Sequence, residues 1–233
     1  MDATPVATRY SPLSRSHASA CNAVHERAAT YGVNALSDAE LVAQFFVGHA
    51  NPLAVANDLI ERFGSLARVA SRDAPTLSSV PGVTGRRITI LRAALELFRR
   101  IAFADLVERE RFSSPADVQR FLALHFASAE HESFGVIYLD NRHRVVTFEE
   151  LFRGTVDSAV VFPREVIKRC LAHNASSVVV AHVHPTGFSE PSDMDVRLPR
   201  RLADALAMVD IKLIDHIVVG QNQQTSLAER GLL

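Results

Sequence analysis

The run SSVVVAH (176–182) is apolar without alternation, and it constrains the fold of this chain more than any other stretch. A strand that is apolar on both sides must be covered on both faces, which is typical of inner strands in layered α/β proteins. Pro185 ends this strand, and Ser192 is placed to cap a helix that runs towards Met208. Pro199 is expected to kink that helix or shift its start.

Further strands and helices surround this run in the second half of the chain. SFGVIYLD and VVTFEELF are separated by the polar residues 141–144 and therefore predict a β-hairpin. The pattern predicts a helix over 163–174 and another strand over 211–220. We therefore expect an α/β (α+β) domain with a mixed β-sheet flanked by helices over residues 130–233.

The first half of the chain has a helical pattern with short breaks. Residues 1–25 are rich in Ser, Ala and Thr and are expected to form a flexible arm. Residues 26–104 are expected to form a small helical domain. His17, Cys21 and His25 could share one helix face and hold a metal, but no fourth ligand is near them, so chance spacing is the better interpretation.

A Pro-Gly turn in SSVPGVTGRR (78–87) precedes the longest predicted helix and resembles a helix-hairpin-helix. Such turns present backbone N–H groups to a DNA phosphate. The candidate DNA contacts are Gly82, Gly85, Arg86 and Arg87. An ordinary interhelical turn with a solvated arginine face explains the pattern equally well. The two glycines are three apart rather than the usual two, which weighs against binding.

The composition of the chain limits the classes of partner that it can bind. With 233 residues, 48% of them hydrophobic, the chain can form one large or two small domains. A formal net charge of -1 provides no global basic field, so any DNA surface must be a local patch. Two distant cysteines and no apolar leader or span favour a soluble cytoplasmic protein without membrane contact. The oligomeric state stays open, a dimer included.

His182 and His184 stand at the end of the predicted buried strand. Because they are two apart, both side chains lie on the same face of that strand. Asp195 lies one turn into the next helix, where it can face the strand end. Two imidazoles and a carboxylate are a typical set for catalytic zinc, which leaves a fourth position to water. We therefore expect one Zn²⁺ per chain at these three residues.

A zinc hydrolase also needs a general base that is not itself a ligand. Spacing alone does not choose among the acidic residues of the second half, which include Glu130, Glu132, Asp140, Glu149, Glu150, Asp157 and Glu165.

The pattern His-x-His-Pro followed by Ser-x-x-Asp resembles the signature of JAB/MPN metalloproteases, the JAMM motif. More narrowly, the chain resembles the RadC family through blocks such as ALSDAEL (35–41), SVPGV (79–83), HESFGVIYLDNRHRVV (131–146) and LIDHIVVG (213–220). The resemblance implies an N-terminal helical RadC domain over 26–104. It also implies a JAB/MPN, cytidine-deaminase-like domain over 112–233.

The resemblance also implies a function, the hydrolysis of a peptide or isopeptide bond in a peptide or protein substrate. Glu132 matches the glutamate that activates water, and His182, His184 and Asp195 match the metal ligands. Ser192 would steady the oxyanion or orient the site, besides serving as a helix cap. The family's historical label of DNA repair supports the alternative of a DNA-associated protein whose metal domain is a scaffold. An inactive fold used for protein contacts is a third hypothesis.

Four other residues of the family-like blocks have expected roles of their own. Val183 stands where RadC proteins usually have Asn, and strand alternation predicts that it points away from the metal. His216 is expected to be buried and hydrogen-bonded in a structural role. Asp157 could support a metal-binding histidine or a turn, and Arg164 is expected in a solvated or interdomain ion pair.

Overall fold

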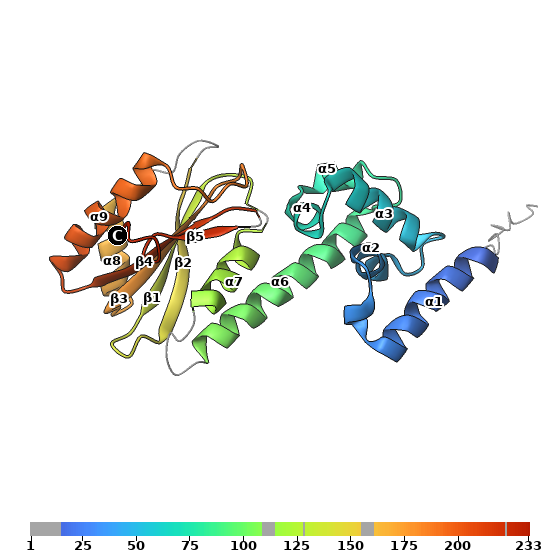
Figure 1. Cartoon of the computed structure of the whole chain (residues 1–233), viewed down its shortest axis with the longest axis horizontal. Helices are drawn as coiled ribbons and strands as arrows, with labels where there is room; N and C mark the ends of the chain where they lie inside the picture. Colours follow the sequence, from blue (N-terminus) through green and yellow to red (C-terminus); the bar gives the residue numbers. More distant parts are fainter. Residues whose placement is uncertain (1–14, 109–114, 128, 155–160, 222) are drawn as a thin grey trace, which may run out of the picture. The chain divides into compact units, whose positions relative to one another are not determined.

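The computed structural model describes residues 15–108, 115–127, 129–154, 161–221 and 223–233. The chain forms two compact units, Met1–Leu91 and Arg92–Leu233. Helices and one mixed sheet confirm the expected α/β (α+β) class (Figure 1). No helix within the described ranges is long and apolar enough to cross a bilayer.

The first unit is helical. It contains α1 (Arg15–Tyr31), η1 (Val33–Ala35), α2 (Asp38–Ala43), η2 (Gln44–Phe46), α3 (Pro52–Phe63), α4 (Leu66–Ser71), α5 (Ala74–Ser78) and the start of α6 (Gly85–Val107). Ser37 and Glu40 form a capping box on α2, and Gly64 ends α3 with a φ of 86°. Residues 15–25, which we expected to belong to a flexible arm, are helical, whereas residues 1–14 lie outside the described part.

The turn between α5 and α6 depends on Gly82. Its φ is 86°, and a Cβ added there would lie 2.8 Å from Val55 Cγ2 and 2.9 Å from His49 Nε2. Glycine is therefore required by both backbone conformation and packing. Gly85, the first residue of α6, has open space around it, and the following Arg86 is exposed. DNA contact by this turn stays a prediction.

Arg87 has partners within its own unit. Its guanidinium donates hydrogen bonds to the carbonyl oxygens of Phe45, at 2.5 Å, and Val47, at 2.8 Å. It also lies over the ring of the fully buried Phe46, 5.5 Å from the ring centroid. Arg87 therefore satisfies carbonyl groups at the end of η2, which is a structural role, and its contact with DNA stays a prediction.

The second unit has three layers (Figure 1). Its five-stranded sheet has the order β2-β1-β3-β4-β5. The strands are β1 (Ser133–Leu139), β2 (Val145–Arg153), β3 (Ser177–Val183), β4 (Lys212–Val219) and β5 (Gln224–Ser226). The helices α8 (Pro163–Ala172) and α9 (Asp193–Ala207) cover one face, and α7 (Pro115–His125) with the end of α6 covers the other. The predicted hairpin, the helix over 163–174 and the strand over 211–220 are confirmed as β1 with β2, α8 and β4. Strand β5 was not foreseen.

Strand β3 is the centre of this sheet. All of its residues are buried, as the apolar run predicts, and it pairs with β1 antiparallel and with β4 parallel. Val179, Ala181 and Val183 pack in the core beside α7, whereas Val178 and Val180 pack in the core beside α8 and α9. Val183 thus points away from the face that His182 occupies, as alternation predicts.

Helix α9 continues past Pro199 without a break. Pro199 is buried and lacks the N–H that would bond the carbonyl of Asp195, four residues earlier. Asp195 stays in the first turn of the helix, and the kink expected at Pro199 stays a prediction.

We predict that Arg87→Ala destabilises the first unit by about 1–3 kcal/mol, because carbonyl groups of η2 lose charged donors. Arg86→Ala, at an exposed neighbouring position, should change stability by less than about 0.5 kcal/mol. Urea unfolding followed by far-ultraviolet circular dichroism measures both. Equal stability of the two variants would contradict the structural role of Arg87.

Candidate metal centre

Three residues from two adjacent elements meet at one end of the sheet. His182 is the second-to-last residue of β3, and His184 follows the strand directly. Asp195 lies in the first turn of α9. Because β3 and β4 are parallel, the chain must return from the end of β3 to the start of β4 through a crossover, which α9 provides. The first turn of α9 therefore lies near the end of β3. The strand end and the helix start bring the three side chains together.

The ligand atoms are close enough to share one metal ion. His182 Nε2 lies 2.9 Å from His184 Nε2 and 3.0 Å from Asp195 Oδ1, and His184 Nε2 lies 3.4 Å from Asp195 Oδ2. Atoms bound about 2.1 Å from a tetrahedral ion lie roughly 3.4 Å apart, so a small expansion of this cluster accommodates one. Within the described residues, this is the one group of three potential ligands that converges in this way.

The ring orientation of His184 is set by a backbone carbonyl. His184 Nδ1 lies 2.9 Å from Phe188 O, and a carbonyl oxygen can only accept, so Nδ1 carries the proton. In the neutral ring, Nε2 then has a free lone pair directed at the cluster. The loop reaches this geometry through Gly187, whose φ of 92° favours glycine.

Ser192 holds Asp195 through a capping box. Ser192 N and Oγ both donate to Asp195 Oδ2, at 2.7 Å each, while Asp195 N donates to Ser192 Oγ at 3.3 Å. The residue that caps α9 therefore also orients the carboxylate of the cluster. Its predicted hydrogen bond to an oxyanion stays a prediction.

The electrostatics of the cluster favour a bound cation. Burial alone would raise the pKa of Asp195, but hydrogen bonds from His182 and His184 bring it well below its ordinary value. The Asp195 carboxylate is in turn the main cause of a raised pKa for His184. The carboxylate is thus ionised at neutral pH and faces two ring nitrogens, which is the donor set of a metal site.

Glu132 lies beside this cluster without being one of its three converging residues. It directly precedes Ser133, which pairs with Val183, so Glu132 stands opposite His184 at the sheet end. Its charge contributes to the raised pKa of His184. Four of the other candidate bases are engaged elsewhere: Asp140 with Arg144, Glu149 with Arg169, Glu150 with His125, and Glu165 with Lys168.

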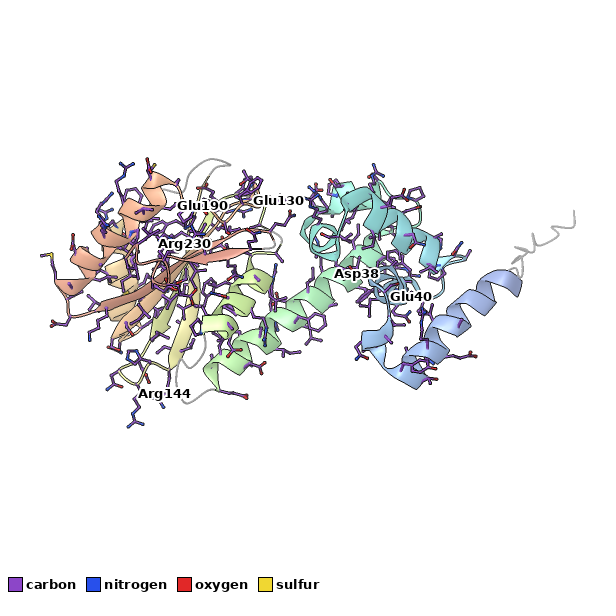
Figure 2. The ribbon with its side chains drawn as sticks, in the orientation of Figure 1. Asp38, Glu40, Glu130, Arg144, Glu190 and Arg230 are labelled. Atoms are coloured by element: carbon purple, nitrogen blue, oxygen red, sulfur yellow. The ribbon has the colours of Figure 1, made fainter. Side chains whose placement is uncertain are left out.

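The loop between β3 and α9 is fastened to the C-terminal hairpin. Arg230 Nη1 donates to Glu190 at 2.8 Å, and both side chains are labelled in Figure 2. Thr225 Oγ1 donates to the buried Ser189 Oγ at 3.2 Å. Gly220 allows the closest approach, since a Cβ there would lie only 2.5 Å from the Gly187 carbonyl oxygen. The hairpin therefore supports the loop that positions His184.

These supporting residues could not be predicted from the sequence. Gly220 and Phe188 carry no local signal, because their roles depend on a contact between two turns. His216 was expected to be buried and hydrogen-bonded, and it is, but its partner at 2.7 Å is His182. Arg164 is exposed and pairs with the neighbouring Glu165, and Asp157 lies outside the described residues.

A mixed sheet covered on both faces, with a His-x-His and Asp cluster at the end of its central strand, defines a JAB-type domain with a candidate metal site. Comparison with known families agrees, since residues 112–232 match the RadC-like JAB domain. A UPF0758 protein of Thioalkalivibrio sulfidiphilus is 47% identical over 211 residues, covering 89% of this chain and 94% of that protein. A UPF0758 protein of Nitrosococcus oceani is 48% identical over 205 residues, covering 87% and 92%. The chain belongs to the RadC family.

We predict that Gly220→Ala disturbs this candidate metal site and weakens its expected binding of Zn²⁺ by about 10-fold or more, as loss of outer-shell support commonly does. The new methyl group must push the backbone at Gly187 and Ser189, which moves the loop that carries His184. Competition with a chromophoric chelator measures the affinity. Gly85→Ala, where a methyl group meets open space, is the control. Unchanged affinity in Gly220→Ala would refute this account of the loop.

Proposed function

We propose that this RadC protein is a zinc-dependent hydrolase of the JAB/MPN type, acting as a metallopeptidase or isopeptidase. One observation carries the proposal: two histidine nitrogens and a carboxylate converge, and a further carboxylate, Glu132, stands next to them without joining them. A hydrolase needs this division, because ligands hold the metal while a separate base handles the proton. The family membership supports the same reading.

Zinc, when bound by His182, His184 and Asp195, would supply a Lewis acid and make water acidic enough to ionise near pH 7. Glu132 is assigned the proton transfer. Its carboxylate accepts a proton from the attacking water and later gives it to the amine nitrogen that leaves. The C–N bond of the amide breaks, and the products are a carboxylic acid and an amine.

Ser192 is assigned to orienting Asp195, because its hydroxyl donates to Oδ2. We further propose that this O–H turns to the carbonyl oxygen of the substrate as negative charge develops there. The backbone donor of Ser192 would keep Asp195 in place meanwhile, since Ser192 N also donates to Oδ2.

The test separates metal binding from proton transfer. His184→Ala should lose stoichiometric zinc, because a ligand is removed from a set of three. Glu132→Gln should keep zinc and lower kcat by about 10²–10⁴-fold, because a general base is removed. Zinc is measured by mass spectrometry of metals, and turnover by cleavage of quenched-fluorescence peptides and of isopeptide-linked substrates.

Matched variants control for the loss of a charge or a ring. Glu130→Gln, two residues before Glu132 and exposed, should keep both zinc and turnover. His25→Ala, on an exposed face of α1, should keep zinc and thereby exclude a site at that helix. Wild-type protein without stoichiometric zinc would end the proposal. So would a zinc-loaded protein that cleaves no peptide or isopeptide substrate.

A further inference from the structure

His216 lies behind the metal cluster in the centre of β4. Its side chain is fully buried, and its Nε2 lies 2.7 Å from His182 Nδ1. The ring of Phe134 packs edge-on against the imidazole of His216, with the two ring centroids 6.2 Å apart. Its second nitrogen, Nδ1, is buried and has no hydrogen-bond partner within the described residues. Such an unpartnered buried polar atom is uncommon in native proteins and calls for an explanation.

The backbone leaves His216 little freedom to move. His216 N donates to Asp215 Oδ1 at 2.7 Å, and His216 O accepts from Leu227 N at 2.9 Å. Val180 is its neighbour in the parallel register between β3 and β4. The ring is therefore held against His182 from the side opposite to the metal cluster.

The hydrogen bond between His182 and His216 can run in two directions. A neutral imidazole has one N–H, so one of the two rings donates and the other accepts. If His216 Nε2 donates, His182 carries its proton on Nε2, where Asp195 Oδ1 at 3.0 Å accepts it. If His182 Nδ1 donates instead, His182 Nε2 has a free lone pair, but the remaining proton of His216 lies on the unpartnered Nδ1.

The two directions belong to different states of the site. Without metal, donation from His216 satisfies every N–H of the pair, and the unpartnered Nδ1 is only an acceptor. With metal, His182 Nε2 must offer its lone pair, so its proton lies on Nδ1 and must be accepted by His216. The imidazole of His216 can serve in both states because either nitrogen can carry its proton.

We propose that His216 is a positioning residue that selects the ring tautomer of His182, and that the hydrogen bond between them reverses when the site takes up metal. This inference rests on metal binding as assigned in the proposed function. His216 touches neither the metal nor the substrate and acts only through His182. His184 needs no such partner, because a carbonyl oxygen already fixes its tautomer.

Two variants of His216 distinguish this role from a structural one. His216→Phe keeps an aromatic ring of similar size but cannot accept a hydrogen bond, so zinc affinity should fall by about 10- to 100-fold. His216→Gln places an amide near the position of Nε2 and can donate or accept, so its zinc affinity should stay within about threefold of wild type. Chelator competition measures each value.

Stability without metal provides the control for folding. His216→Phe removes the unpartnered Nδ1 but also the Nε2 that bonds His182 Nδ1, so the metal-free variant should melt below wild type, whereas metal-free His216→Gln should melt near it. A residue with a purely structural role would lower the melting temperature of His216→Phe in the same way but leave its zinc affinity unchanged.

Nitrogen-15 spectra of the histidine rings observe the reversal directly. We expect His216 to carry its proton on Nε2 in metal-free wild type and on Nδ1 after zinc is added. An unchanged His216 tautomer, or full zinc affinity in His216→Phe, would overturn this inference and leave the hydrolase proposal intact. Zinc binding without any peptidase activity would overturn the hydrolase proposal and leave this inference intact. A wild-type protein that binds no zinc would end both.

Discussion

Burial of β3 on both faces is the constraint on which the rest of the metal-site unit depends. The strand has neighbours on both sides and helical layers above and below, so its backbone cannot shift without breaking two ladders. A strand held in this way directs His182 and His184 to one face at a defined height in the sheet. The parallel pairing with β4 then requires a crossover helix, and the start of that helix delivers Asp195.

The cluster gathers electron-rich atoms at a place where water is partly excluded. His182 is buried, and the side chains of His184 and Asp195 are only 15% and 14% exposed. Carboxylate and imidazole lone pairs in such a place repel one another unless a cation or a proton lies between them. The capping box of Ser192 and the carbonyl of Phe188 hold the groups together, so the arrangement is prepared before any ion arrives.

The C-terminal segment supports this arrangement from outside. Asp215 accepts hydrogen bonds from Ser226 Oγ at 2.6 Å and from Ala228 N at 3.0 Å, which ties the last turn to β4. Arg230 reaches Glu190 in the metal loop. Hydrogen bonds thus occupy both carboxylate oxygens of Asp215, which gives it a structural role outside the cluster.

Much of this architecture could be predicted from periodicity and local chemistry. The apolar run predicted a doubly covered strand, and the spacing of two histidines placed both rings on one face. The choice among several acidic residues could not be made by spacing, and it needed either the family resemblance or the pairing of β1 with β3. The carbonyl partners of Arg87 could not be predicted for the same reason, since they lie 42 and 40 positions earlier.

The sequence by itself determined most of the elements, the caps and the same-face geometry of the histidines, because these follow from contacts between residues close in the chain. Only the tertiary structure decided that Glu132 stands opposite His184, that Gly220 must be small, and that His216 meets His182. The first and the last of these outcomes depend on the register between strands that are distant in sequence, and the second depends on a contact between two turns. A shift of one residue in that register would turn every such side chain to the other face of the sheet.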